Sequence, residues 1–583
     1  MRAAAEEAEL ARPAEDGTSR CEAILRAALM LGVATAAFAA FAGRTSPSVT
    51  AEDPAEFQTL VPLVGVPHSG YPLYVALAHV LSWVLPGSPA GRVNLFSALT
   101  GACALATAVW FTGLLAAGRW PSRLFGGAVA ATLLGYCHTF VLSATIAEMY
   151  ALQVFLSLVA MGLLVAWAKA GPNARPWLLA GAFALLGALL GVHSTAVALY
   201  PGAAAFVALT SWRERRWPEG GAYALAAGLL GACFSWVGLF WVLWRHHVDL
   251  DHWALIRDCP EFFGVPREDS FWRSLFYELL NRQYQYEISS ASPELVRLQL
   301  LALPHRFAAE LFPAGAVAAL LGWLEVGRRR WTCSLFAGLV VVVDAFLAVR
   351  LNLTFKTHFY FLVPNAIAAC FAGAFAGRTH AWLSERLEAL VLRARRKALV
   401  SRARHERTRA LVGGIAFVLV SAGAGAAHAL AVEPYRRWVD TLEPFVRDAA
   451  APRVGERPTD RSNTGHADNV RALVRRMPPS SIVFVDWYEH FTFKYVGRVE
   501  RLNEGLSVFE SYPLGTGQRE FPIDYVRLIE DPRRTRPVFF VFNARPPDLP
   551  GFELVSRGDA LFELVRRDGT AVDGSSEQNA THE

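Results

Sequence analysis

The recurrence of long apolar segments is the feature that most restricts how this chain can fold. Uncharged runs of roughly 17–25 residues interrupt the sequence again and again, and an α-helix of that length crosses a hydrocarbon core of about 30 Å. Apolar residues make up 53% of the 583 positions and charged residues only 18%, which excludes an ordinary soluble domain. The pattern predicts an all-α polytopic membrane protein.

About eleven segments have the length and composition of membrane-spanning helices. They lie near residues 21–43, 95–117, 124–143, 149–168, 177–192, 195–211, 219–244, 302–325, 331–350, 359–377 and 410–431. The first follows a charged stretch and is longer than the apolar core of a secretory signal, so we expect a retained helix. Residues 71–86 are apolar but short and flanked by proline, which favours a helix lying at the outer membrane interface.

The basic residues predict the topology. They gather in loops that share one side of the membrane if residues 71–86 do not span it. These loops contain Arg119 and Arg123, Lys169 and Arg175, Arg213 with Arg215 and Arg216, Arg328 to Arg330, and the run 378–409. We therefore expect a cytoplasmic tail at 1–20, a membrane domain at 21–432 and outer loops at 44–94 and 246–300. The basic run favours lipid headgroups as its partner and not nucleic acid.

The region after the last predicted span has a different character. Residues 483–487, 506–509 and 537–544 read as short buried strands between charged helical stretches. This predicts a small α/β domain at 433–569 on the outer, extracytoplasmic side. Residues 570–583 are polar, and we expect them to be disordered.

Several classes of function lack support in the sequence. It contains no glycine-rich phosphate loop and no CxxC pair, and most of its seven cysteines fall inside apolar runs. We therefore expect no nucleotide cofactor, no metal and no disulfide framework.

Two carboxylates in the first outer loop are the strongest candidates for chemistry. Asp53 and Glu56 are three residues apart, so they share a face if the segment is helical. One of them could be the general base that activates a hydroxyl acceptor. The alternative is an acidic pair that caps an interfacial helix.

Further polar residues cluster at the predicted outer ends of helices. They are His68, Arg92, Asn94, Glu148, His193, Lys356 and His358. Lys356 and His358 are suited to holding a phosphate diester, because a nearby cation offsets charge on the leaving phosphate. Taken singly, each also fits a packed histidine or an arginine reaching the interface.

Spaced motifs in this part of the chain resemble the transmembrane protein 260 family, also called domain of unknown function 2723. The motifs are Gly65 to His68, Pro72-Leu73-Tyr74, Arg92-Val93-Asn94, Ala147-Glu148-Met149-Tyr150, Gly191-Val192-His193, Arg282-Gln283-Tyr284 and Tyr360 to Pro364. They occur in the family's order over roughly residues 23–380.

That family is similar to the GT-C glycosyltransferases, including the protein O-mannosyltransferases, which use polyprenyl- or dolichyl-phosphate sugars at the outer membrane face. The resemblance implies a GT-C-like fold and a catalytic role for Asp53 and Glu56. It implies substrate-binding roles for His68, Tyr74, Arg92, Asn94, Glu148, Tyr150, His193, Arg282, Tyr284, Lys356 and His358. This chain departs from the pattern with His-Ser-Gly in place of His-Pro-Pro.

Two functions from different classes follow. The first is a glycosyltransferase that moves mannose or a similar hexose to a protein hydroxyl or glycan. The alternative is a transporter or flippase for lipid-linked sugars or small solutes, which should show repeated halves with polar residues near mid-membrane. A scaffold without chemistry is a third possibility.

Alanine- and arginine-rich usage indicates a bacterial inner membrane and undecaprenyl phosphate, whereas a eukaryotic source would place the protein in the endoplasmic reticulum.

Overall fold

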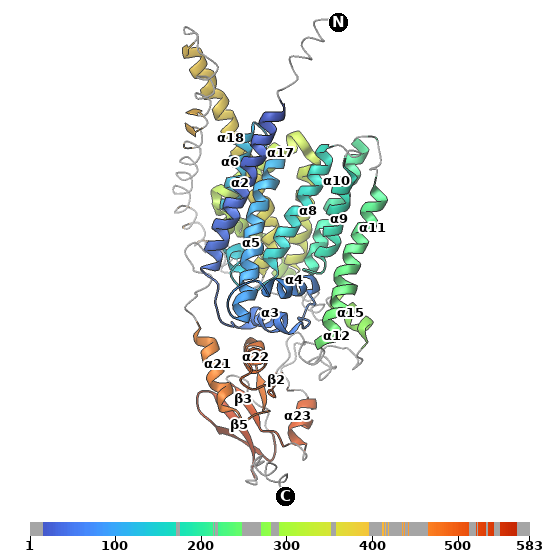
Figure 1. Cartoon of the computed structure of the whole chain (residues 1–583), viewed down its shortest axis with the longest axis vertical. Helices are drawn as coiled ribbons and strands as arrows, with labels where there is room; N and C mark the ends of the chain where they lie inside the picture. The colour runs from blue at the N-terminus through green and yellow to red at the C-terminus, as the bar shows by residue number, and fades with distance from the viewer. Residues whose placement is uncertain are drawn as a thin grey trace.

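The fold combines a bundle of long helices with a small sheet domain at one end (Figure 1). The computed structural model describes residues 15–170, 175–213, 220–247, 270–280, 291–350, 357–395, 464–511, 523–531, 535–541 and 549–567, with isolated positions between these ranges. Together they confirm the predicted fold class: an apolar all-α region followed by a small α/β region.

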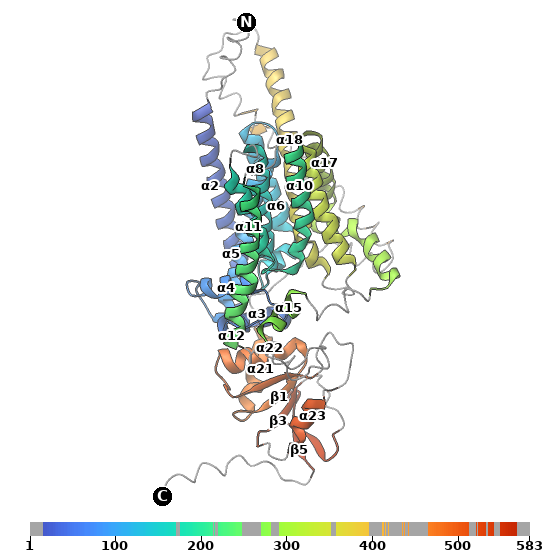
Figure 2. The same ribbon diagram turned by 90° about the vertical axis from the view of Figure 1, so that its right-hand side faces the viewer.

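The bundle consists of long apolar helices that stand side by side (Figures 1 and 2). They are α2 (Glu15–Ala42), α5 (Pro89–Leu115), α6 (Trp120–Tyr136), α8 (Tyr150–Ala170), α9 (Pro176–Leu189), α10 (Leu199–Arg213), α11 (Gly221–Ala232), α17 (Pro293–Val349) and α18 (Leu362–Arg395). Within the described residues, seven helical stretches are long and apolar enough to cross a membrane. The predicted span at 410–431 lies mostly outside the described residues, so the total of about eleven remains a prediction.

The backbone of the α17 segment leaves the helical region at Phe312 (φ 61°, ψ 153°) and at Arg330 (φ −144°, ψ 68°), and the parts before and after Arg330 are antiparallel. The indole of Trp323 donates to the Ser334 carbonyl at 2.8 Å, and the Ser334 hydroxyl donates to the Trp323 carbonyl at 2.8 Å. Residues eleven apart on one straight helix would be separated by about 16 Å. The chain therefore reverses at Arg330, between the predicted spans 302–325 and 331–350.

Glycines let two of these helices approach closely. A Cβ placed on Gly373 of α18 would lie 2.3 Å from the carbonyl oxygen of Gly126 on α6. By contrast, a Cβ on Gly113 of α5 would meet nothing within 4 Å. The α6–α18 contact thus depends on the absence of a side chain.

We predict that Gly373→Ala lowers the free energy of unfolding by about 1–3 kcal/mol, because the added methyl group forces the two backbones apart. Reversible denaturation in mixed micelles measures the loss. Gly113→Ala is the matched control and should leave stability unchanged or raise it slightly, because alanine favours the helix. Equal effects of the two substitutions would contradict the proposed close packing.

Basic residues from several loops meet at one end of the bundle. Lys169 Nζ and Arg330 Nη1 each donate to the carbonyl of Leu114, at 3.2 and 3.3 Å. Arg123 binds the Glu22 carboxylate of α2 at 2.9 Å. This gathering at the carboxyl end of α5 fits the predicted one-sided distribution and suits the helix dipole there. That this side is cytoplasmic remains a prediction.

Two short helices lie across the other end of the bundle: α3 (Glu52–Leu63) and α4 (Pro72–Ser82) (Figure 1). The 11 residues of α4 extend over only about 16 Å, too short to cross a bilayer. Leu77 and Val80 of α4 are exposed and apolar, as are Trp83 and Val84 directly after it. These features support the expected interfacial position of residues 71–86.

The C-terminal domain is a five-stranded sheet in the order β2-β1-β3-β5-β4. Its strands are β1 (Ile482–Val485), β2 (Ser507–Glu510), β3 (Val538–Val541), β4 (Phe552–Ser556) and β5 (Leu561–Arg566). The first three run parallel, while β5 and β4 add antiparallel pairs. Three strands coincide with the predicted segments. The last two were not predicted, because they mix charged and apolar residues and are only partly buried.

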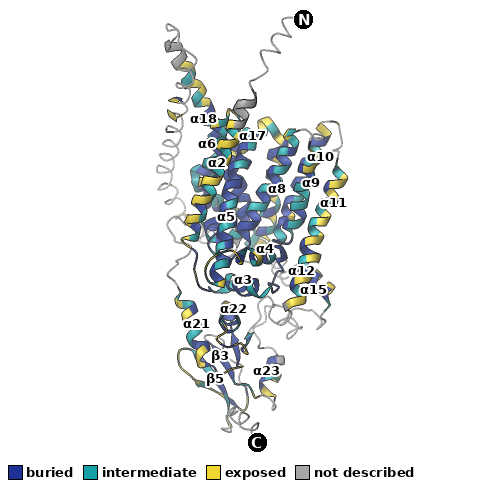
Figure 3. Ribbon diagram, viewed as in Figure 1, coloured by how far each residue is buried: buried dark blue, intermediate teal, exposed yellow. Residues whose placement is uncertain are grey.

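Helices α21 (Gly465–Arg476), α22 (Trp487–Lys494) and α23 (Ile523–Glu530) flank this sheet. In Figures 1 and 2, α22 lies directly against α3. Val49, Ala55, Leu60 and Ala90 of the membrane region are buried in the same apolar cluster as α21, α22 and the sheet. Figure 3 shows this contact as buried, whereas α11 is exposed along the edge of the bundle. The domain and the first outer loop therefore share one core.

Candidate active site

The two predicted carboxylates lie on α3, at the junction of the bundle and the C-terminal domain. Asp53, in the first turn, is half-buried and accepts a hydrogen bond from the indole nitrogen of Trp487 at 3.3 Å. Glu56, one turn later, is fully buried. A carboxylate near a helix N-terminus is stabilised by the helix dipole. The predicted helical spacing is present, but the two groups have different partners.

Glu56 holds the turn that contains His68. One carboxylate oxygen accepts the backbone N–H of His68 at 2.8 Å, and the other contacts the Nδ1 atom of the same residue. His68 is itself 7% exposed. Because both oxygens of Glu56 are used in this way, we assign it to positioning the turn and the imidazole ring.

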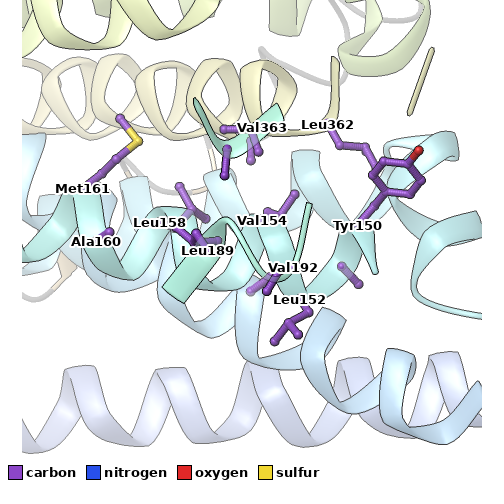
Figure 4. Close-up of a cluster of buried hydrophobic side chains, with 14 of the residues drawn as sticks. Tyr150, Leu152, Val154, Leu158, Ala160, Met161, Leu189, Val192, Leu362 and Val363 are labelled. Carbon is purple, nitrogen blue, oxygen red and sulfur yellow. The ribbon is translucent and has the colours of Figure 1, made fainter. Parts of the chain in front are cut away.

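An aromatic cluster extends from this turn into the bundle. The ring of Tyr71 stacks on that of His193, with centroids 5.6 Å apart. The ring centroid of His193 is 5.2 Å from that of Tyr150 and 5.8 Å from that of Tyr360. The amide of Leu73 donates to the Gly191 carbonyl at 2.8 Å and so docks α4 beside this cluster. Figure 4 shows Tyr150 at one end of the buried apolar cluster of α8, next to Leu362.

His193 is held as a neutral imidazole. Its Nδ1 atom accepts the backbone N–H of Thr195 at 3.2 Å and lies 2.7 Å from the Thr195 hydroxyl. Burial, together with the nearby His68, lowers the pKa of His193 to about 3. Because Nδ1 is an acceptor, the single ring proton belongs on Nε2. His193 can therefore donate a hydrogen bond but does not supply a cation at neutral pH.

Tyr71 is held as a protonated phenol. Burial chiefly raises its pKa well above the usual value, and the negative charges of Asp53 and Glu148 raise it further. A hydrogen bond with the Ser69 side chain lowers this pKa in part. Glu148, which is buried, lies two residues before the start of α8. Asp53 is connected to this aromatic cluster through Trp487 and His68.

Two other predicted site residues have structural contacts. Asn94 is fully buried; its amide nitrogen donates to the Ser46 carbonyl at 2.9 Å, and its oxygen accepts from Gln58 at 3.0 Å. Tyr74 is fully buried with its hydroxyl 3.4 Å from that of Ser97. These contacts brace α3 and α4 against α5. Neither side chain is placed beside Asp53 by a described contact.

Of the remaining predicted site residues, the structure describes two. Arg92 is half-buried in the first turn of α5, and His358 is half-buried in η4 (Thr357–Phe361). The ring of His358 is 4.4 Å from that of Phe359, which stacks on Tyr150 at 5.0 Å. Arg282, Tyr284 and Lys356 lie outside the described residues.

Sequence reasoning missed Tyr71 and Trp487 as members of this cluster. Tyr71 has a left-handed backbone (φ 40°) just before the Pro72 that begins α4, and the Gly-Tyr-Pro order was its only local signal. Trp487 follows the carboxyl end of the parallel strand β1, a position where open parallel sheets commonly bind ligands. Its partner is 434 positions away, so no local pattern could have identified the pair.

Among the residues that the structure describes, no group of three or more histidine, cysteine, aspartate or glutamate side chains is placed to hold a metal ion. The site can accept a proton at Asp53. It can donate hydrogen bonds from Tyr71 and His193.

Solved structures of membrane glycosyltransferases are similar in chain path at low sequence identity. ArnT from Cupriavidus metallidurans in the apo state is 14% identical, with 93% of this chain and 98% of that chain covered and a TM-score of 0.46. AglB from Archaeoglobus fulgidus, solved with an inhibitory peptide and a dolichol-phosphate, is 11% identical, with 81% and 63% covered and a TM-score of 0.43. The arabinofuranosyltransferase AftD from Mycobacteria is 14% identical, with 94% and 40% covered and a TM-score of 0.42. At these sequence identities and TM-scores, the similarity says nothing about the substrates of this chain.

No curated protein matches the chain in sequence. One family model does match: residues 53–216 fit the Protein O-mannosyl-transferase TMEM260 N-terminal domain. The matched range begins at Asp53 and includes Glu56, His68, Glu148 and His193. The match confirms, for this part of the chain, the family resemblance read from the spaced motifs.

Proposed function

We propose that this protein transfers a sugar from a polyprenyl-phosphate donor to an acceptor hydroxyl at the membrane face where α3 and the C-terminal domain meet. The observation that carries the proposal is the position of Asp53. It is a half-buried carboxylate at the start of the matched domain, beside the Glu56–His68 pair and the Tyr71–His193 stack. Mannose is the first candidate sugar and a protein hydroxyl the first candidate acceptor, because the matched domain is described as that of a protein O-mannosyltransferase.

The reaction assigns one task to each group. The acceptor oxygen attacks the anomeric carbon while Asp53 takes the hydroxyl proton. The bond between that carbon and the phosphate oxygen breaks, and the lipid phosphate leaves with the bonding electrons. The protonated Tyr71 and the Nε2–H of His193 are donors that can orient sugar hydroxyls. Glu56 fixes His68 at the edge of the site.

The direct test uses the full-length protein in lipid nanodiscs with a panel of radiolabelled polyprenyl-phosphate sugars, polyprenyl-phosphate mannose first, and serine- or threonine-containing peptides. We expect label in the peptide only when the lipid donor and the protein are both present. Movement of labelled lipid across proteoliposome membranes without any transfer would instead support the transporter alternative.

His358 gives a prediction about donor binding, since it lies in η4 beside the Phe359–Tyr150 stack. We expect His358→Ala to raise the donor KM about ten- to a hundredfold through loss of a charge-assisted contact of roughly 1.5–3 kcal/mol. Exposed His246 on α12 (Phe240–His247) provides the control variant His246→Ala. An unchanged donor KM in His358→Ala would remove this histidine from the phosphate site.

A further inference from the structure

We propose that Trp487 of the C-terminal domain is a positioning residue for Asp53, so that this domain forms part of the active site. The inference rests on the proposed function and assigns a specific task to a residue that lies outside the matched family domain.

The contact geometry supports this assignment. The indole N–H of Trp487 donates to a carboxylate oxygen of Asp53 at 3.3 Å. The same indole meets the His68 ring edge-on, with centroids 5.4 Å apart and planes at 85°. An indole nitrogen is only ever a donor, so it can hold a carboxylate oxygen in one position. One side chain thus contacts both Asp53 and the histidine fixed by Glu56.

The helix that carries Trp487 is fixed to the first outer loop. The Thr492 hydroxyl donates to the Thr50 carbonyl at 2.7 Å, and the Thr59 hydroxyl donates to the Phe491 carbonyl at 3.0 Å. These two bonds run in opposite directions across the α3–α22 contact. They restrict sliding of α22 and therefore fix where Trp487 stands relative to Asp53.

Contacts farther from the site hold the domain in the same place. The Tyr495 hydroxyl accepts the backbone N–H of Ala90 at 3.1 Å, at the start of α5. Arg471 donates to the Ser48 hydroxyl at 3.0 Å while it pairs with Glu500 at 2.6 Å. The Trp487 contact is thus one of several between the domain and the residues around α3.

A purely structural tryptophan would need its ring but not its N–H group. Trp487→Phe keeps an aromatic ring against His68 and removes the donor to Asp53. Tyr488→Phe changes the next residue of α22, which is 49% exposed, and serves as the matched control. The two variants separate donation to the carboxylate from general packing of the helix.

We expect Trp487→Phe to lower kcat about tenfold with an unchanged donor KM and an unchanged melting temperature, because Asp53 loses the hydrogen bond that positions it for proton transfer. In an Asp53→Asn background the same substitution should have no further effect, since the two residues act through one carboxylate. Tyr488→Phe should retain wild-type kcat. A wild-type kcat in Trp487→Phe, or full additivity with Asp53→Asn, would overturn the proposal.

An activity-independent measurement separates this inference from the proposed function. In ¹⁵N-indole spectra of the full chain in nanodiscs, Trp487→Phe identifies the Trp487 resonance by its disappearance. That resonance should shift in Asp53→Asn and stay in place in Glu52→Gln. If the Trp487 resonance shifts in Asp53→Asn but the wild type transfers no sugar, the contact is retained and the proposed function is rejected. If the chemical shift of the Trp487 resonance is the same in Asp53→Asn as in the wild type, the contact itself is rejected.

Discussion

Asp53→Asn is expected to reduce kcat for sugar transfer by about 10²–10⁴ while the protein still folds and still binds the lipid donor, because general-base catalysis contributes a factor of this size. Asparagine keeps the shape of the side chain and can still accept the Trp487 hydrogen bond. What it loses is basicity. Single-turnover transfer with saturating donor measures the effect on the chemical step.

Two further variants make the result specific to Asp53. Glu52→Gln removes a negative charge one residue earlier on α3 and should retain most of the activity. Glu56→Gln should reduce kcat less than Asp53→Asn does, because Glu56 is assigned to holding His68. The reverse ranking would exchange the roles of the two carboxylates. Full transfer by both single variants and by the double variant would eliminate the carboxylate mechanism.

His68→Ala is expected to lower the free energy of unfolding by about 3–5 kcal/mol, because it removes the ring partner of a carboxylate with no exposed surface. The backbone N–H of residue 68 can still bind Glu56, but the second oxygen loses its contact. Reversible unfolding in mixed micelles at neutral pH gives the difference.

A second histidine of the same outer loop provides the control for this measurement. Among its described contacts, the ring of His79 makes one hydrogen bond, with the Val61 carbonyl at 2.8 Å, and meets the Trp83 ring edge-on. His79→Ala should therefore cost only about 1 kcal/mol, the usual net value of a neutral hydrogen bond. Adding Glu56→Gln to His68→Ala should recover part of the lost stability, since no charge then remains to be buried. Equal costs for the two histidines would argue against a buried ion pair.

Much of the architecture could be predicted because it depends on local patterns. Apolar length and basic loops identified the helices and the short α4, and β-branched and aromatic runs identified β1, β2 and β3. The antiparallel pair β4 and β5 escaped prediction, because its strands mix the charged residues Glu553, Glu563 and Arg566 with apolar ones and are only partly buried. Register and pairing of such strands depend on tertiary contacts that a sequence window does not contain.

The site was predictable in part for a related reason. Asp53, His68, Glu148 and His193 stand out as polar residues at the ends of apolar helices. The rings of His68 and His193 both contact Tyr71, and Trp487 connects Asp53 to His68. Asn94 has the same sequence signal, yet it forms a structural bridge between Ser46 and Gln58. Polarity at a helix end indicates that a partner exists. It does not reveal whether that partner is substrate or protein.

The separation of 434 residues between Asp53 and Trp487 has a consequence for biogenesis. Asp53 leaves the ribosome long before Trp487, and every described bundle helix after α2 is made between the two. The carboxylate therefore cannot acquire its indole partner until the C-terminal domain has been made and folded. Contacts so distant along the chain form slowly. A nascent or stalled chain carries the first loop without its cover, and maturation of the enzyme becomes the final event of synthesis.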